Sequence, residues 1–223
     1  MTNNLFTIGY ASFSIKDFIR ILKSHEITAL VDVRSAPYSK YKPEFKNDNL
    51  NKVLADNNIS YIFSGKYVGA RVENPECYID GKLNYGLLKE TKNYQTGITR
   101  ILDGMKDYRI TLMCAEKDPV NCHRTFLVCR TLRSYPIKIH HILGDGSLED
   151  HNVTEGRLLK LHGLDQEDIF RSEEERVVEV YDRMCEKITF NSKYIFFKLN
   201  SVLLYLLNKL YPFICNLYFM LLI

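Results

Sequence analysis

The chain has 223 residues, 46% of them hydrophobic, which is enough for one ordinary domain with a sizeable core. Its formal net charge is +3, but the segment after residue 190 contains three lysines and no acidic residue. Without those three, the 30 Lys and Arg residues become 27, against 27 acidic residues. The domain is therefore neutral, and its net charge gives no electrostatic argument for nucleic-acid binding.

The cysteines are too few and too widely spaced for the disulfide framework of a small secreted domain. They are Cys77, Cys114, Cys122, Cys129, Cys185 and Cys215. The chain begins Met-Thr-Asn-Asn and then enters an apolar run, without the basic and long apolar regions of a signal peptide. We expect free thiols and a cytoplasmic location.

Strands and helices alternate along the first 143 residues. Residues 5–9 form a short apolar run that ends at glycine, and residues 14–24 carry apolar side chains at helical spacing behind a serine cap. Similar patterns predict strands at residues 29–33, 59–63, 109–113 and 138–143, and helices at residues 49–57, 97–105 and 121–133. This alternation predicts a single α/β domain with a mostly parallel, roughly five-stranded sheet covered by helices on both faces.

The remainder of the domain is a long connection and two further helices. Residues 64–83 are too many for an ordinary connection, so we expect a functional loop or lid there. Two amphipathic helices are predicted at residues 152–161 and 172–188, and the second begins with a serine and three glutamates at its positive end.

Residues 191–223 differ in composition from the α/β domain of residues 1–190, because they are hydrophobic and contain no Gly, Ala or acid. Residues 202–223 approach the ~20 residues that span a bilayer, which would make the tail a membrane anchor. Against an anchor stand Asn208, Lys209, Pro212 and Asn216, since polar groups are costly there. A partner-binding or self-packing extension, and an aberrant extension of the reading frame, are the alternatives.

Polar residues gather where the predicted strands end. In an open parallel sheet, ligands bind beyond the carboxyl ends of the strands, where helix N-termini converge and favour anions or thiolates. The residues concerned are Tyr10 and Ser12 after the first strand, Asp32 and Arg34 at the second, Cys114 and Glu116 after the fourth, and Cys122, His123 and Arg124 at the start of the following helix.

The charged residues have two interpretations each. Asp32 and Arg34 point the same way from a strand, so they form either a structural ion pair or an anion site in which Asp32 orients the arginine or acts as a base. Arg124 is either a solvated residue in the first turn of its helix or a residue whose guanidinium binds a phosphate or carboxylate through two N–H groups. Arg71 is either an exposed loop residue or a cation that closes over a bound anion.

Cys114 has three interpretations. It is a small hydrophobe at a strand end, or a nucleophile activated by His123 or Arg124, or a metal ligand with Cys122 and His123. Adjacent Cys and His residues are an awkward pair for one tetrahedral ion, and no Cys-x-x-Cys spacing is present. We therefore assign no metal ligand and predict no particular cofactor.

Several motifs together are specific. They are Thr7-Ile-Gly-Tyr10, Asp32-Val-Arg-Ser35 with Pro37 and Ser39, Gly69-Ala-Arg71, Met113-Cys-Ala-Glu116, Cys122-His-Arg124 and His141-Ile-Leu-Gly-Asp145-Gly146. This set resembles the DUF488 family, a domain of unknown function, over about residues 6–190. The resemblance implies that these motifs form the site and that the tail lies outside the family pattern.

Three functions compete. The first is an enzyme for an anionic, phosphorylated or nucleotide-like substrate: Arg34, Arg71 and Arg124 hold the anion, Cys114 or Glu116 acts on it, Asp32 orients, and Tyr10, Ser12, Cys122 and His123 line the site. The second is a non-catalytic nucleotide or nucleic-acid binding module that adds Tyr38, Tyr41 and Phe45 as stacking surfaces. The third is a redox or metal-sensing protein in which Cys114 and Cys122 form a reversible pair. Membrane contact follows only if the tail is an anchor.

Overall fold

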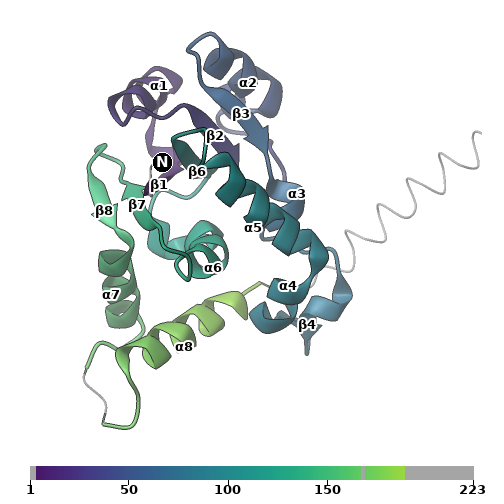
Figure 1. Ribbon diagram of the computed structural model, residues 1–223, viewed down its shortest axis with the longest axis vertical. Helices are drawn as coiled ribbons and strands as arrows, with labels where there is room; N and C mark the ends of the chain where they lie inside the picture. Colours follow the sequence, from purple (N-terminus) through teal and green to yellow (C-terminus); the bar gives the residue numbers. More distant parts are fainter. Residues whose placement is uncertain (1–3, 167–168, 189–223) are drawn as a thin grey trace, which may run out of the picture. The chain divides into compact units, whose positions relative to one another are not determined.

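The computed structural model describes residues 4–166 and 169–188, which belong to one compact unit (Figure 1). The hydrophobic tail, residues 191–223, lies outside the described residues, so the interpretations of it stay predictions. Within the described part of the chain, no helix is long and apolar enough to cross a membrane.

All five predicted strands are present, and four pairs of neighbours in the sheet are parallel. They are β1 (Asn4–Gly9), β2 (Ala29–Asp32), β3 (Ser60–Phe63), β6 (Ile110–Cys114) and β7 (Lys138–Ile142). The sheet has six strands rather than five, in the order β3-β2-β6-β1-β7-β8. The additional strand, β8 (Leu148–Asp150), pairs antiparallel with β7 at the edge of the sheet. It is three residues long and largely exposed, so it has no apolar pattern to predict it.

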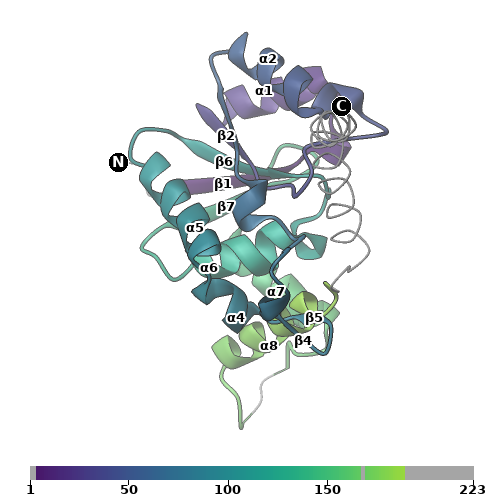
Figure 2. The same cartoon turned by 90° about the vertical axis from the view of Figure 1, so that its right-hand side faces the viewer.

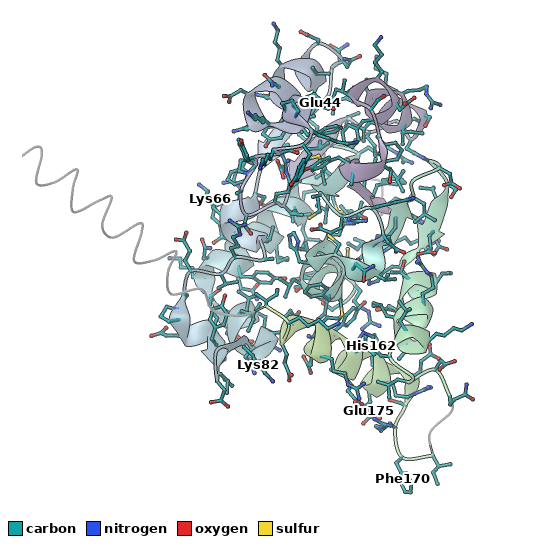
Figure 3. All side chains as sticks on the ribbon, turned by 180° about the vertical axis from the view of Figure 1, so that it is seen from behind. Glu44, Lys66, Lys82, His162, Phe170 and Glu175 are labelled. Atoms are coloured by element: carbon teal, nitrogen blue, oxygen red, sulfur yellow. The ribbon has the colours of Figure 1, made fainter. Side chains whose placement is uncertain are left out.

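Helices cover both faces of the sheet, as expected, and Figure 2 shows the two layers. On one face lie α1 (Ile15–Ser24) and α2 (Asn47–Ala55), packed on side chains such as Phe6 and Ile8 of β1. On the other lie α5 (Lys92–Gly104), a π-helix (Arg124–Cys129) that continues as α6 (Arg130–Leu132), α7 (His151–Leu161) and α8 (Glu173–Cys185). Side chains fill the space on both faces (Figure 3). Alternate residues of β1 enter the two clusters, because side chains alternate across a strand.

The segment of residues 64–83 has structure of its own. It contains α3 (Gly65–Val68), a 3-10 turn (Pro75–Cys77) and a hairpin of β4 (Tyr78–Ile79) and β5 (Lys82–Leu83), and α4 (Tyr85–Glu90) follows it. Val68, Cys77 and Leu83 are almost fully buried in the larger hydrophobic cluster. The segment is therefore fastened to the core at several points, and its role as a lid stays a prediction.

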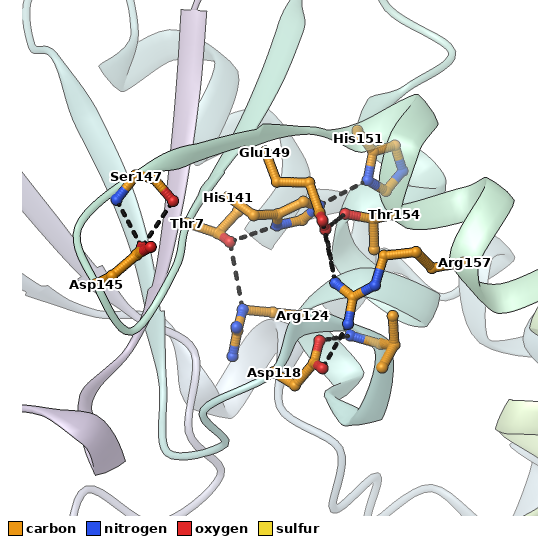
Figure 4. A network of polar contacts seen from close by, with 11 residues as sticks. Thr7, Asp118, Arg124, His141, Asp145, Ser147, Glu149, His151, Thr154 and Arg157 are labelled. Carbon is orange, nitrogen blue, oxygen red and sulfur yellow. Dashed lines mark hydrogen bonds and ion pairs between the residues drawn. The ribbon is translucent and has the colours of Figure 1, made fainter. Parts of the chain in front are cut away.

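A chain of buried polar groups crosses the core beneath β1 and β7 (Figure 4). Arg124 Nε donates to Thr7 Oγ1 at 3.3 Å, and Thr7 Oγ1 lies 2.7 Å from His141 Nδ1. The Thr7 hydroxyl donates its hydrogen to His141 Nδ1, because at the other end of this chain the Tyr181 hydroxyl gives its only hydrogen to Glu155 and therefore accepts from His151. His141 then carries its hydrogen on Nε2 and donates it to His151 Nδ1, 2.9 Å away.

The same chain continues into the C-terminal helices. His151 Nε2 lies 3.1 Å from the Tyr181 hydroxyl, which donates to Glu155 Oε1 at 2.7 Å, and Glu155 also binds Arg133. Burial, followed by the nearby Arg133 charge, lowers the pKa of His151 to about 4, and burial holds the pKa of His141 well below its ordinary value. Both imidazoles are therefore neutral in the folded protein near pH 7, and they join α7 and α8 to the sheet.

The lowered pKa of His151 makes stability depend on pH. Between its ordinary pKa of 6.5 and about 4, the unfolded chain binds a proton that the folded chain does not, so the free energy of unfolding falls as the pH falls. The full shift corresponds to roughly 3 kcal/mol. His151→Asn, which does not titrate, should flatten the decline in urea unfolding between pH 6.5 and 4.5. The wild type and the variant should have parallel profiles above pH 7.5, and an unchanged decline in the variant would contradict the assignment.

Gly9 ends β1 next to Cys114 in the sheet register, and a Cβ there would overlap the Glu116 carbonyl oxygen. Gly9→Ala should therefore displace the Glu116 loop and lower the free energy of unfolding by about 1–3 kcal/mol. Gly156, exposed within α7, is the matched control, because a Cβ there meets no atom within 4 Å. Gly156→Ala should raise stability by about 0.5–1 kcal/mol. Urea unfolding of both variants tests the pair, and equal effects would show that Gly9 is not sterically required.

Candidate functional site at the carboxyl edge of the sheet

Three neighbouring strands, β2, β6 and β1, deliver the predicted site residues to one edge of the sheet. Asp32 is the last residue of β2, Cys114 the last of β6, and Tyr10 follows β1 directly. The three strands are mutually parallel, so their carboxyl ends lie at the same edge. The strand order thus brings these three residues to one edge of the sheet.

Four side chains from one stretch of chain converge beyond β6. Glu116 Oε2 lies 2.8 Å from Cys114 Sγ and 3.0 Å from Cys122 Sγ. His123 Nδ1 lies 3.4 Å from Cys114 Sγ and 3.9 Å from Cys122 Sγ. One sulfur, nitrogen or oxygen atom from each residue falls within 4.8 Å of all the others. These four residues are called the thiol cluster below.

A short loop explains how adjacent residues reach one point. The Asp118 side chain accepts from Val120 N and begins a 3-10 turn, Pro119–Asn121, that reverses the chain. Cys122 then has extended backbone angles, φ −120° and ψ 136°, whereas His123 is helical at φ −57° and ψ −24°. This change of backbone conformation turns both side chains toward Cys114. The adjacency of Cys122 and His123 in the sequence, which argued against their binding one metal ion, therefore does not prevent their side chains from reaching the same point.

His123 is held by a backbone contact that the sequence did not reveal. Its Nε2 lies 3.0 Å from the carbonyl oxygen of Val33, the residue after β2. A carbonyl oxygen only accepts, so Nε2 carries the hydrogen and Nδ1 faces the two sulfurs. The imidazole thereby joins the end of β2 to the thiol cluster, and no side-chain motif marks a carbonyl of this kind.

The protonation of the thiol cluster is uneven. Burial opposes ionisation of Cys122, but contacts with Cys114, Arg124 and His123 outweigh it and lower the pKa of this thiol. Burial and the neighbouring Cys122 and Glu116 raise the pKa of Cys114. Burial lowers the pKa of His123, and the contacts with Cys122 and the Val33 carbonyl more than reverse this, so the net pKa is raised. These opposite directions favour ionisation of Cys122 over that of Cys114.

Only one member of the thiol cluster faces solvent. Cys114, Cys122 and His123 are 2%, 0% and 8% exposed, whereas Glu116 is exposed. Burial, followed by the charge of Cys122, raises the pKa of the Glu116 carboxyl. Glu116 is therefore the member of the thiol cluster that solvent reaches directly.

Asp32 and Arg34 form the ion pair that was one of their two interpretations. Arg34 Nη2 and Nε donate to the two carboxylate oxygens at 2.6–3.1 Å, and Tyr61 donates to Asp32 Oδ2 at 2.7 Å. Asp32 is 0% exposed and Arg34 5%. Among the described residues, Arg34 Nη1 is buried without a hydrogen-bond partner. One donor of this guanidinium is therefore left over after the ion pair is made.

Two aromatic side chains surround this ion pair. The Arg34 guanidinium carbon lies 5.1 Å from the centroid of the Tyr10 ring. Tyr61, which sequence reasoning did not single out, has its pKa raised by burial and by Asp32. The available signal was its position: Tyr61 pairs with Leu30 on β2, and Leu30 lies on the same face of that strand as Asp32.

Arg124 is completely buried rather than solvated. Its Nη1 donates to the Glu116 carbonyl oxygen at 2.8 Å, and its Nε donates to Thr7. In the described part of the chain, Nη2 has no partner. The side chain therefore fixes the loop that carries Glu116, and a direct role in holding a substrate stays a prediction.

Of the other predicted residues, Ser12 and Arg71 lie at the surface, and Phe45 is buried. The Arg71 backbone N–H donates to Ser35 Oγ, just after β2, at 2.8 Å. The prediction that Phe45 offers a stacking surface to a ligand is wrong, because its side chain is 0% exposed. Its ring stacks on Tyr10 with centroids 4.5 Å apart, so it supports the site from within the core.

Comparisons with known proteins give one finding. Neither the curated proteins nor the solved structures include a match to this chain. A family model described as domain of unknown function DUF488 matches residues 14–131, more than half of the chain. That span contains Asp32, Arg34 and the whole thiol cluster. The chain belongs to the DUF488 family.

Proposed function

We propose that this chain is a cytoplasmic enzyme that acts on an anionic substrate, phosphorylated or nucleotide-like, at the carboxyl edge of its sheet. The observation that carries the proposal is the thiol cluster, which places two thiols, a carboxyl and an imidazole around one point with a single exposed member. Catalytic sites are where several ionisable groups with shifted pKa values meet. A cytoplasmic location is supported by the five free thiols of the described residues.

The anionic character of the substrate is inferred from Arg34. Its ion pair with Asp32 holds the guanidinium rigidly, and the remaining Nη1 has no partner among the described residues. A buried donor without a partner costs about 1–3 kcal/mol, which an oxyanion would recover. The preceding residue, Val33, contacts His123, so this donor belongs to the same edge as the thiol cluster. Tyr10, Ser12, Arg71 and Arg124 are proposed to line or support the substrate position, and Asp32 to orient Arg34.

A panel of phosphomonoesters, phosphodiesters and nucleotides tests the proposal by turnover. Glu116→Gln should lower kcat at least about 100-fold, as expected for loss of an acid or base. Arg34→Lys, which keeps the charge but loses the fork, should raise KM about tenfold or more. Cys129→Ser is the matched control, because Cys129 is a buried cysteine in the π-helix that follows the thiol cluster and is outside that cluster.

The outcomes separate the alternatives. Turnover that is lost in Glu116→Gln and retained in Cys129→Ser supports the enzyme. Saturable binding of a panel member without turnover, in wild type and both variants alike, would replace it with a binding module. If no member of the panel is bound or turned over, the proposal that the substrate is an anion of these classes is contradicted.

A nucleic-acid binding surface is the second candidate, favoured by one exposed patch. Tyr38 and Tyr41 are 62% and 88% exposed, and the ammonium groups of Lys46 and Lys40 lie 4.8 and 5.8 Å from their ring centroids. Exposed aromatic rings beside lysines can stack on unpaired bases and contact phosphates.

A salt titration of single-stranded oligonucleotide binding tests this patch. If it contacts phosphates, Lys40→Ala should reduce the slope of log affinity against log salt concentration by about 0.7. Lys16→Ala on α1, away from residues 38–46 in the sequence, is the control and should leave the slope unchanged. A slope near zero for the wild type would dismiss nucleic acid as the ligand.

A further inference from the structure

We infer that the thiol cluster is a zinc site in which Cys114, Cys122 and His123 hold the ion and Glu116 is a fourth, displaceable ligand. The inference deepens the proposed function, since it assigns the reacting centre of that same edge a Zn²⁺ ion. Binding of the ion itself depends on the ligand geometry alone, so it can be tested without any substrate.

The distances from the imidazole to the two sulfurs are close to those of tetrahedral coordination. With Zn–S of about 2.3 Å and Zn–N of about 2.0 Å, neighbouring ligand atoms of a tetrahedral site lie about 3.5–3.8 Å apart. His123 Nδ1 is 3.4 and 3.9 Å from the two sulfurs, on either side of that range. Glu116 Oε2 is closer to the sulfurs, at 2.8 and 3.0 Å, and it is the one ligand at the surface that is able to move outward.

The surroundings already resemble those of a metal ligand. A zinc-bound histidine usually donates its other ring N–H to a carboxylate or carbonyl oxygen, which orients the ring. His123 Nε2 makes such a contact with the Val33 carbonyl at 3.0 Å. The carbonyl oxygens of Ala115 and Glu116 are fixed as well, by Ala11 N–H at 3.1 Å and by Arg124 at 2.8 Å. The ligand loop is therefore held on both sides of the cluster before any ion binds.

The donor set selects the ion. Two sulfurs and an imidazole nitrogen are ligands for zinc rather than for magnesium or calcium, which take oxygen. Three potentially anionic groups that meet in a largely buried place are costly without a cation. A divalent ion would compensate them, because thiol ligands bind as thiolates and release their protons.

The exposure of Glu116 gives the site an open side. Cys114, Cys122 and His123 are buried, whereas Glu116 is exposed, so an ion held by the four residues would have Glu116 on its solvent side. Catalytic zinc sites keep three protein ligands and one exchangeable position, whereas structural sites are closed. Glu116 at the exchangeable position places the open side on the surface from which a substrate approaches.

Zinc content and cobalt spectroscopy of the full, reduced chain test the inference. We expect about one zinc per chain after equilibration with Zn²⁺ and removal of the unbound metal. With Co²⁺ alone as the probe, thiolate-to-cobalt charge-transfer bands and intense tetrahedral d–d bands should appear. Cys122→Ser should weaken zinc binding by at least about 100-fold, more than loss of an outer hydrogen-bond partner does. Cys129→Ser should bind zinc as the wild type does.

Glu116→Gln distinguishes the displaceable ligand from the other three. It should retain zinc and the thiolate-to-cobalt bands and lose less affinity than Cys122→Ser. Cobalt bound without thiolate bands, zinc retained unchanged in Cys122→Ser, or a reduced chain that excludes zinc would each overturn the site. In the last case a Cys114–Cys122 disulfide on mild oxidation would favour the redox interpretation. Zinc bound without turnover would remove the enzyme proposal and leave the site standing.

Discussion

The contact of the Arg124 guanidinium with the Glu116 carbonyl oxygen is the interaction on which the site depends. It spans 2.8 Å inside the protein, and the same side chain reaches Thr7 in β1. Arg124 follows Cys122 and His123 directly and begins the π-helix. Its buried side chain therefore fixes the start of that helix against the loop after β6. Loss of this contact would separate the two halves of the thiol cluster, although no atom of Arg124 belongs to it.

Such an anchor needs compensation, because a fully buried charge is costly. Part of it comes from the carbonyl and hydroxyl acceptors, while Nη2 has no partner within the described residues. Beyond Thr7, the neutral His141 and His151 carry the hydrogen bonds onward without adding charge. The Tyr181 hydroxyl gives its only hydrogen to Glu155, so it accepts from His151 Nε2, which makes His141 Nε2 the donor to His151 Nδ1 and the Thr7 hydroxyl the donor to His141.

The sequence allows the edge to be predicted but not the contacts made there. Apolar runs in the sequence indicate the strands, and the carboxyl ends of parallel strands lie at one edge of a sheet. Asp32 and Cys114 could therefore be predicted to lie at the same edge. The short exposed β8 has no such pattern, and pairing with β7 alone defines it. Convergence of Cys122 and His123 depends on a change of backbone angles between neighbours, which composition and spacing do not encode. Burial of Phe45 against Tyr10 likewise follows from packing.

Arg34 and the thiol cluster, which lie at the same edge of the sheet, together constrain the chemistry of the proposed substrate. Arg34 Nη1, which has no partner in the described part of the chain, and the imidazole of the thiol cluster are linked through Val33, so both are fixed to the end of β2. A ligand of the proposed kind, which satisfies Arg34 with an oxyanion, would thereby lie at the edge that carries the thiol cluster and its exposed member Glu116. Because the Asp32–Arg34 pair is rigid and buried, we expect the side chain that moves when the proposed anion binds to be Glu116. In the proposed enzyme, a carboxylate that leaves the sulfurs as the anion arrives would couple substrate binding to opening of the reacting centre.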